Sequence, residues 1–119
     1  FGEERFRELE TAALEGLRGE RSLLVSCGGG IVETPRNIEL MHDMGFCVYL
    51  DGDLDDSLRQ IRRSDTRPDF RSAEHAARLL EHRRPLYEQA ADLTVDIRGT
   101  SFTDVSYTVA ELLLERGLI

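Results

Sequence analysis

Three consecutive glycines stand where this sequence is best suited to hold a ligand. Gly28, Gly29 and Gly30 directly follow the apolar run 23–27, which predicts a buried strand, and they lead into a helix that Pro35 is expected to begin. Because glycine has no side chain, backbone N–H groups at the end of such a strand can approach an anionic or polyhydroxylated ligand closely. A plain connection between a strand and a helix is the alternative interpretation of the glycines alone.

Arginines occupy the other positions that could do chemistry. Arg7 and Glu10 lie three residues apart on a predicted helix, so their side chains share one face. Arg67 lies in a polar segment, and Arg83 begins the run RRPLY at 83–87. The planar fork of arginine suits a carboxylate or a phosphoryl group better than the point charge of lysine does. Taken singly, these residues could equally form a helix-surface ion pair and a solvated face.

Taken in order, these motifs resemble the shikimate kinase family. The order is FRELE at 6–10, the glycine run, RP at 67–68, RRPLY at 83–87 and the strand-like LTVDI at 93–97. It is similar to that family along essentially the whole chain. The resemblance implies an enzyme that transfers a phosphoryl group from ATP, with Mg²⁺, to the 3-hydroxyl of shikimate in chorismate and aromatic amino-acid biosynthesis. Such chemistry needs positioned anions and neutralised negative charge, so arginines, a metal and a closing lid are expected.

The resemblance also implies roles for the residues named above. Arg7 would bind the carboxylate of shikimate, and Glu10 would hold Arg7 in place. Arg83 would be a second arginine on the same carboxylate. The three glycines would meet the ring hydroxyls with their backbone.

Three further implied roles concern ATP and the metal. Arg67 would belong to a mobile lid at about 64–72, which closes over ATP and stabilises the charge on the transferred phosphoryl group. Arg98 would lie where the family contacts adenine. Ser26 would hold a water of the magnesium shell. Asp51, after a predicted strand, is expected to be a loop residue and not a metal ligand.

The sequence departs from the family in one respect, because all fifteen of its basic residues are arginine. A phosphate-binding loop of the form GxxxxGK[ST], whose lysine meets the β- and γ-phosphates, is therefore not among these 119 residues. In the family that loop precedes the FRxxE helix. The resemblance thus covers the C-terminal two thirds or so of such an enzyme, and we expect an N-terminal strand unit to be missing here and this chain alone to be inactive.

Composition narrows the range of partners. The formal net charge of −8 argues against nucleic acid and anionic membranes as partners, and no apolar run is long enough to span a membrane. Cys27 and Cys47 lie in apolar surroundings without metal-ligand spacing, which predicts buried, reduced thiols in a cytoplasmic protein. With its N-terminal part present, the protein is expected to be a monomer.

Alternating helices and strands predict an α/β fold with a mostly parallel sheet in three αβα layers, as in P-loop kinases, within a single domain 1–119. Pro85 is expected to kink or split a helix at 72–91. The other expected elements are helices at 3–17, 35–44, 53–63 and 102–116, and strands at 23–27, 46–50 and 93–97.

Two other functions fit the same residues. A non-catalytic shikimate-binding or regulatory module would keep Arg7, the glycines and Arg83 and would lack ATP chemistry. Another small-molecule P-loop kinase, such as a gluconate kinase relative, would share the fold, although FRxxE with GGG argues against it. Shikimate binding without turnover would indicate the module, and a comparison of shikimate with gluconate as substrates would identify the second kind of kinase.

Overall fold

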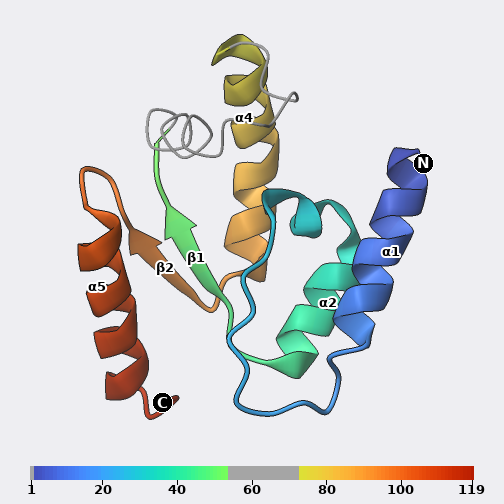
Figure 1. The fold of residues 1–119 in the computed structure, drawn as a ribbon. Helices are drawn as coiled ribbons and strands as arrows, with labels where there is room; N and C mark the ends of the chain where they lie inside the picture. The colour runs from blue at the N-terminus through green and yellow to red at the C-terminus, as the bar shows by residue number, and fades with distance from the viewer. Residues whose placement is uncertain (1, 54–72) are drawn as a thin grey trace. The chain divides into compact units, whose positions relative to one another are not determined.

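The computed structural model describes residues 2–53 and 73–119 (Figure 1). The predicted helix at 53–63 beyond its first residue, the lid at about 64–72 and Arg67 lie outside the described residues. The chain divides into two compact units, Phe1–Tyr49 with Leu79–Leu93 and Leu50–Arg78 with Thr94–Ile119. That residues 1–119 form one domain stays a prediction. The elements are α1 (Glu3–Glu15), the 3₁₀ helix η1 (Gly29–Glu33), α2 (Pro35–Met44), β1 (Val48–Asp51), α4 (Ala73–Ala90), β2 (Leu93–Asp96) and α5 (Phe102–Glu115).

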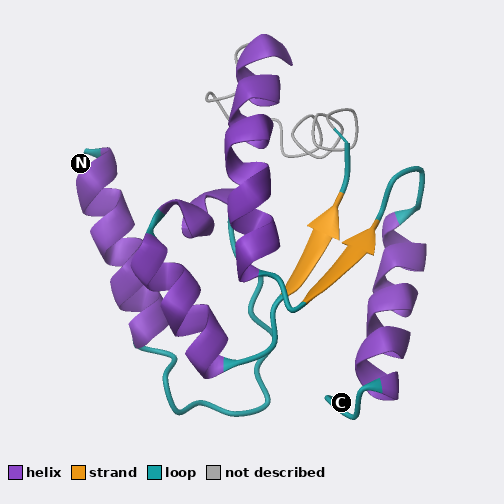
Figure 2. Ribbon diagram, turned by 180° about the vertical axis from the view of Figure 1, so that it is seen from behind, coloured by secondary structure: helices purple, strands orange, loops and turns teal. Residues whose placement is uncertain are grey.

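Helices α1 and α2 lie side by side in the first unit (Figures 1 and 2). Glu3 and Glu4 lie in the first turn of α1, where negative charge is favourable beside the helix dipole. Pro35 begins α2 as predicted, since its missing N–H needs no partner there. Leu14, Ile38 and Leu40 are the buried apolar residues of these two helices. Ile38 belongs to an apolar cluster with Val32 of η1 and Ala90 of α4.

Asn37 is the one fully buried polar side chain among the described residues. Its amide nitrogen donates to the carbonyl of Ile31 at 2.9 Å, and its side-chain oxygen accepts from the Thr11 hydroxyl at 2.7 Å. These bonds connect α2 to α1 and to η1, which contains two of the three glycines. Asn37 therefore fixes the segment on which the candidate site is built, and the sequence analysis did not identify it.

We expect Asn37→Ala to lower the free energy of unfolding by about 2–4 kcal/mol, because it leaves the Thr11 hydroxyl and the Ile31 carbonyl buried without a partner. Urea unfolding followed by circular dichroism measures this change. Glu39→Ala on the same helix is the matched control, because the Glu39 ion pair with Arg36 is exposed and should be worth less than about 1 kcal/mol. Equal stabilities for the two variants would contradict the structural role of Asn37.

Strands β1 and β2 pair in parallel (Figure 2). The amides of Asp92 and Leu93 donate to the carbonyl of Cys47, and four residues further along, Ile97 donates to Asp51. Both sides of the ladder advance in the same direction, which defines a parallel pair. The polypeptide between the strands includes α4, as a parallel connection requires. The predicted α/β class with a parallel sheet is confirmed.

The predicted strand at 23–27 is wrong. These residues form no strand, and Leu24 is 96% exposed. A strand is stable only when a neighbouring backbone pairs with its N–H and C=O groups, and among the described residues no strand pairs with this run. The apolar sequence therefore indicates that the segment favours a strand, but it does not show that a partner strand is present to pair with it.

Helix α4 continues through Pro85, so of the two predicted outcomes, a kink or a split, the split is wrong. The final helix α5 matches its prediction closely. Ser101 accepts a hydrogen bond from the backbone N–H of Asp104 and caps its start. Gly117, with φ of 72°, follows its end in the left-handed conformation that favours glycine.

None of the described helices combines the length and apolar character needed to cross a membrane.

Candidate functional site

Arg7 reaches from α1 to the glycine run. Its Nη1 donates to the carbonyl of Gly30 at 3.0 Å and to Glu10 at 3.1 Å, while its Nη2 donates to Glu3 at 3.3 Å. Burial by itself would lower the pKa of Arg7, but the hydrogen bonds and charges of Glu10 and Glu3 outweigh it and raise the pKa above its ordinary value. The predicted pairing of Arg7 with Glu10 is confirmed, and Arg7 is a fixed cation beside the glycines.

Side chains from other helices lie very close to the glycine run at two of its three positions. A Cβ at Gly30 would collide with the Arg7 guanidinium, lying 2.8 Å from its Nη2. A Cβ at Gly29 would lie 2.9 Å from the Tyr87 hydroxyl and 3.4 Å from Nη1 of Arg83. Nothing lies within 4 Å of the same position at Gly28. Glycine is thus needed for close packing at Gly29 and Gly30, while Gly28 is open on that side.

Arg83 extends from α4 to the other side of the same segment. Its Nε donates to Oε2 of Glu33 at 2.9 Å, and Nε2 of His82 lies 2.9 Å from the other oxygen of Glu33. Burial opposes ionisation of Glu33, but the hydrogen bonds from Arg83 and His82 prevail and lower its pKa. The sequence analysis missed Glu33, since nothing in the sequence relates it to an arginine 50 residues away.

Tyr87 secures α4 against the glycine run. Its hydroxyl donates to the carbonyl of Gly29 at 2.8 Å, and its ring stacks on Tyr49 with centroids 5.2 Å apart. Burial raises the pKa of Tyr87, although the charge of nearby Arg83 opposes that rise. The hydroxyl therefore remains a hydrogen-bond donor near neutral pH.

Of the residues predicted to serve ATP and metal, Ser26 and Arg98 lie in the part of the chain that the structure describes. Ser26 lies in the exposed loop before the glycines. Arg98 is exposed and forms ion pairs with Asp96 at 3.1 Å and with Asp51 at 3.6 Å. Asp51 is the last residue of β1 and not a loop residue. Within residues 2–53 and 73–119, no group of three or more His, Cys, Asp and Glu side chains is placed to hold a metal ion.

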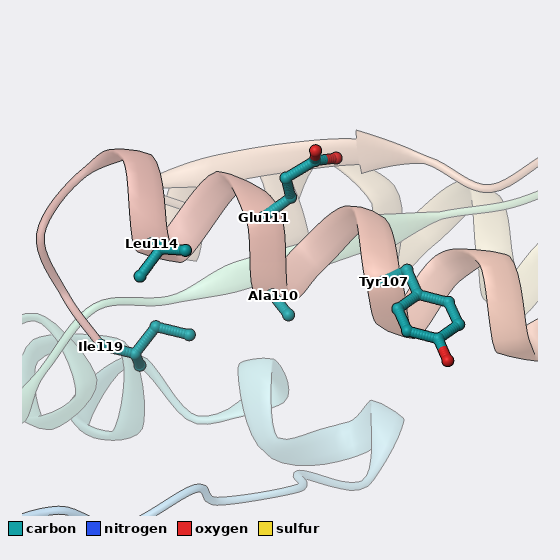
Figure 3. Close-up of a pocket in the computed structure, with 5 residues that line it drawn as sticks. All are labelled: Tyr107, Ala110, Glu111, Leu114 and Ile119. Carbon is teal, nitrogen blue, oxygen red and sulfur yellow. The ribbon is translucent and has the colours of Figure 1, made fainter.

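A shallow apolar hollow of about 350 Å³ lies on the second unit (Figure 3). Tyr107, Ala110 and Leu114 line it along α5, together with Ile119 from the C-terminal tail. Among the described residues of its lining, Glu111 has a charged side chain and none has a basic one. The hollow contains none of the arginines and glycines described above, so it offers no group for binding a carboxylate.

Both cysteines are free thiols, but Cys27 is exposed and Cys47 is only partly buried, contrary to the prediction that both are buried. Burial, with the charges of Asp92 and Cys27, raises the pKa of Cys47 to about 11. Two pKa units above an ordinary thiol mean about a hundredfold less thiolate at pH 8. We expect iodoacetamide to alkylate Cys47 about a hundredfold more slowly than in the protein unfolded in urea, as followed by peptide mass spectrometry. Equal rates in the two states would contradict this environment.

The first unit places two arginine side chains beside glycine backbone, and a carboxylate and hydroxyl groups are the kinds of ligand that such groups can bind. Two arginines approach the glycine run from different helices, each held by a glutamate. Fixed guanidinium groups bind a carboxylate with several charge-assisted hydrogen bonds. Bare backbone at Gly28 leaves room for a ligand that forms hydrogen bonds to peptide groups.

Known proteins resemble this chain in sequence. A family model described as shikimate kinase matches residues 1–113. Proteins named shikimate kinase are 42% identical in Thioalkalivibrio sulfidiphilus, 37% in Geobacter sulfurreducens and 33% in Dehalococcoides mccartyi. These matches cover 87%, 97% and 94% of this chain, respectively. The chain spans 56%, 65% and 65% of the length of those relatives.

A solved structure resembles it as well. Shikimate kinase from Acinetobacter baumannii in complex with shikimate matches with a TM-score of 0.84 and 27% sequence identity. The match covers 96% of this chain and 65% of that one. Together with the parallel strands, this likeness confirms the predicted P-loop kinase-like αβα fold class.

Proposed function

Because the chain belongs to the shikimate kinase family, we propose that the protein it forms phosphorylates the 3-hydroxyl of shikimate with MgATP. The proposed reaction supplies phosphorylated shikimate to chorismate and aromatic amino-acid biosynthesis, and the proposed enzyme is a cytoplasmic monomer. One observation carries the proposal for the substrate: two held arginines, Arg7 and Arg83, approach a run of three glycines.

Each polar group of shikimate has a counterpart in this arrangement. Arg7 and Arg83 bind the carboxylate with their guanidinium N–H groups, and Glu10 keeps Arg7 oriented. Gly28, Gly29 and Gly30 present peptide groups to the ring hydroxyls. Binding through the carboxylate orients the ring, so that one hydroxyl is held for phosphoryl transfer.

The groups that serve ATP are only partly present in this sequence. Bound ATP would supply the phosphoryl group, and Mg²⁺ would neutralise charge on its phosphates. Arg67 is proposed to stabilise the charge developing on that group, Arg98 to contact the nucleotide and Ser26 to hold a water of the metal. The described residues alone do not make a metal site, and the 119 residues contain no lysine for a phosphate-binding loop. No catalytic step is therefore assigned here to a metal ligand.

The test is an ADP-release assay on the protein in its natural length, with ATP, Mg²⁺ and either shikimate or gluconate. We expect turnover with shikimate only. Arg67→Ala should abolish turnover while shikimate binding, measured by calorimetry, is retained. Unchanged turnover in Arg67→Ala would overturn the role of Arg67, and turnover with gluconate alone would overturn the substrate assignment.

A non-catalytic shikimate-binding module is the second candidate, because the two held arginines beside the glycines need no nucleotide to bind a carboxylate. It keeps the carboxylate site and lacks phosphoryl transfer. The same two measurements separate the candidates, because a module binds shikimate in the calorimeter and releases no ADP at any concentration of ATP.

A further inference from the structure

Glu33 controls the direction of the Arg83 side chain. It is the last residue of η1, three positions after Gly30, and both it and Arg83 are largely buried. The bond between them uses only Nε of Arg83, at 2.9 Å from Oε2 of Glu33. The two terminal nitrogens of the guanidinium group take no part in this bond. Nη1 lies on the side of Gly29, where Arg83 also shares a hydrogen bond with the Tyr87 side chain. A guanidinium group has five N–H donors, so others remain for a ligand.

Glu33 is itself well fixed. Its other carboxylate oxygen lies 2.9 Å from Nε2 of His82, so both oxygens have a partner. The 3₁₀ helix that contains Glu33 is tied to α2 through the bond from Asn37 to the Ile31 carbonyl. A carboxylate held at both oxygens and on a fixed backbone restrains the guanidinium group it binds.

We propose that Glu33 is a positioning residue, which aims the terminal nitrogens of Arg83 at the substrate carboxylate over the glycine run. The inference deepens the proposed function and rests on it. Glu10 holds Arg7 in the same way, so each of the two arginines has its own glutamate. The four charges cancel, and recognition of the carboxylate then depends on the direction of the N–H groups more than on net charge.

The negative charge of Glu33 has an opposite effect on shikimate affinity. A glutamate near the substrate carboxylate repels it, and removing that glutamate would tighten binding if repulsion outweighed orientation. Because the bond to Glu33 uses Nε and leaves N–H donors on the terminal nitrogens of Arg83 for the substrate, we expect orientation to prevail. The sign of the change in affinity therefore decides between the two.

The experiment is calorimetric titration of the natural-length protein with shikimate. Glu33→Ala should weaken binding about tenfold, and Glu33→Gln, which keeps an acceptor for Nε of Arg83, should restore most of the affinity. In an Arg83→Ala background, Glu33→Ala should cause no further loss, because the residue to be positioned is gone. Glu39→Ala, which removes an exposed glutamate on α2, is the matched control and should leave the affinity unchanged.

Unchanged or tighter binding in Glu33→Ala would overturn the inference, as would equal losses with and without Arg83. If the unsubstituted protein binds no shikimate, the proposed function fails instead. In that case, the exchange rate of the Arg83 Nε–H, measured by ¹⁵N NMR, still decides the positioning role. It should rise in Glu33→Ala and stay slow in Glu33→Gln, and equal rates in all three proteins would refute the role.

Discussion

Replacing Arg7 by alanine should weaken shikimate binding by about thirtyfold or more. Truncation removes a charge-assisted contact to the substrate and leaves the partly buried Glu10 carboxylate without its partner. Losing a hydrogen-bonded partner of a buried charge costs about 2–5 kcal/mol, which corresponds to at least a thirtyfold loss. Calorimetric titration with shikimate measures the affinity, and circular dichroism checks that the variant is folded.

Arg5→Ala is the matched control for this substitution. Arg5 lies on the same helix and pairs with Glu8 at the same spacing, with 57% of its side chain exposed against 20% for Arg7. Since it does not reach the glycine run, its loss should change the affinity less than twofold. A similar loss in both variants would mean that general charge on α1, and not the position of Arg7, attracts the ligand.

Gly30→Ala should weaken shikimate binding by about tenfold to a hundredfold with little change in stability. The new Cβ collides with the guanidinium end of Arg7, which is flexible and can move away at low cost to the fold. By moving, Arg7 loses its bond to the Gly30 carbonyl and the direction in which it faces the ligand. Gly30 is not in the left-handed conformation, so alanine adds no backbone strain. Titration and thermal unfolding measure the two quantities.

Gly28→Ala tests whether the effect is specific to the contact with Arg7. No atom lies within 4 Å of a Cβ at Gly28, and its φ of −67° suits alanine. If the methyl group alone obstructs shikimate, both alanine variants will weaken binding equally. If displacement of Arg7 is the cause, Gly30→Ala will weaken shikimate binding clearly more than Gly28→Ala does. A Gly30→Ala protein with full affinity would argue against this cause.

Much of the site follows from local sequence. Arg7 and Glu10 pair because residues three apart on a helix share a face, and that spacing is visible in the sequence. Pro35 begins α2 and Ser101 caps α5 for reasons that concern only neighbouring residues. The order of the motifs also identified the family, which the comparisons confirm.

Local sequence misled where the outcome depends on distant partners. The apolar run at 23–27 has the composition of a buried strand, but a strand also needs a neighbouring backbone, and none pairs with it among the described residues. Pro85 removes one backbone N–H from α4, yet the helix continues through it. Such results are decided by packing around the segment and not by the propensity of its residues.

The sequence by itself determined which residues bear charge, where helices begin and end, and which family the chain belongs to, because these depend on neighbouring positions. Only the tertiary structure decided which contacts form between residues far apart in the sequence. Glu33 meets Arg83 across 50 residues, Tyr87 meets Gly29 across 58, and Asn37 joins α1 to η1. Contacts of that sequence separation arise when helices pack, so no local pattern encodes them, and they set the direction in which the two arginines face a ligand.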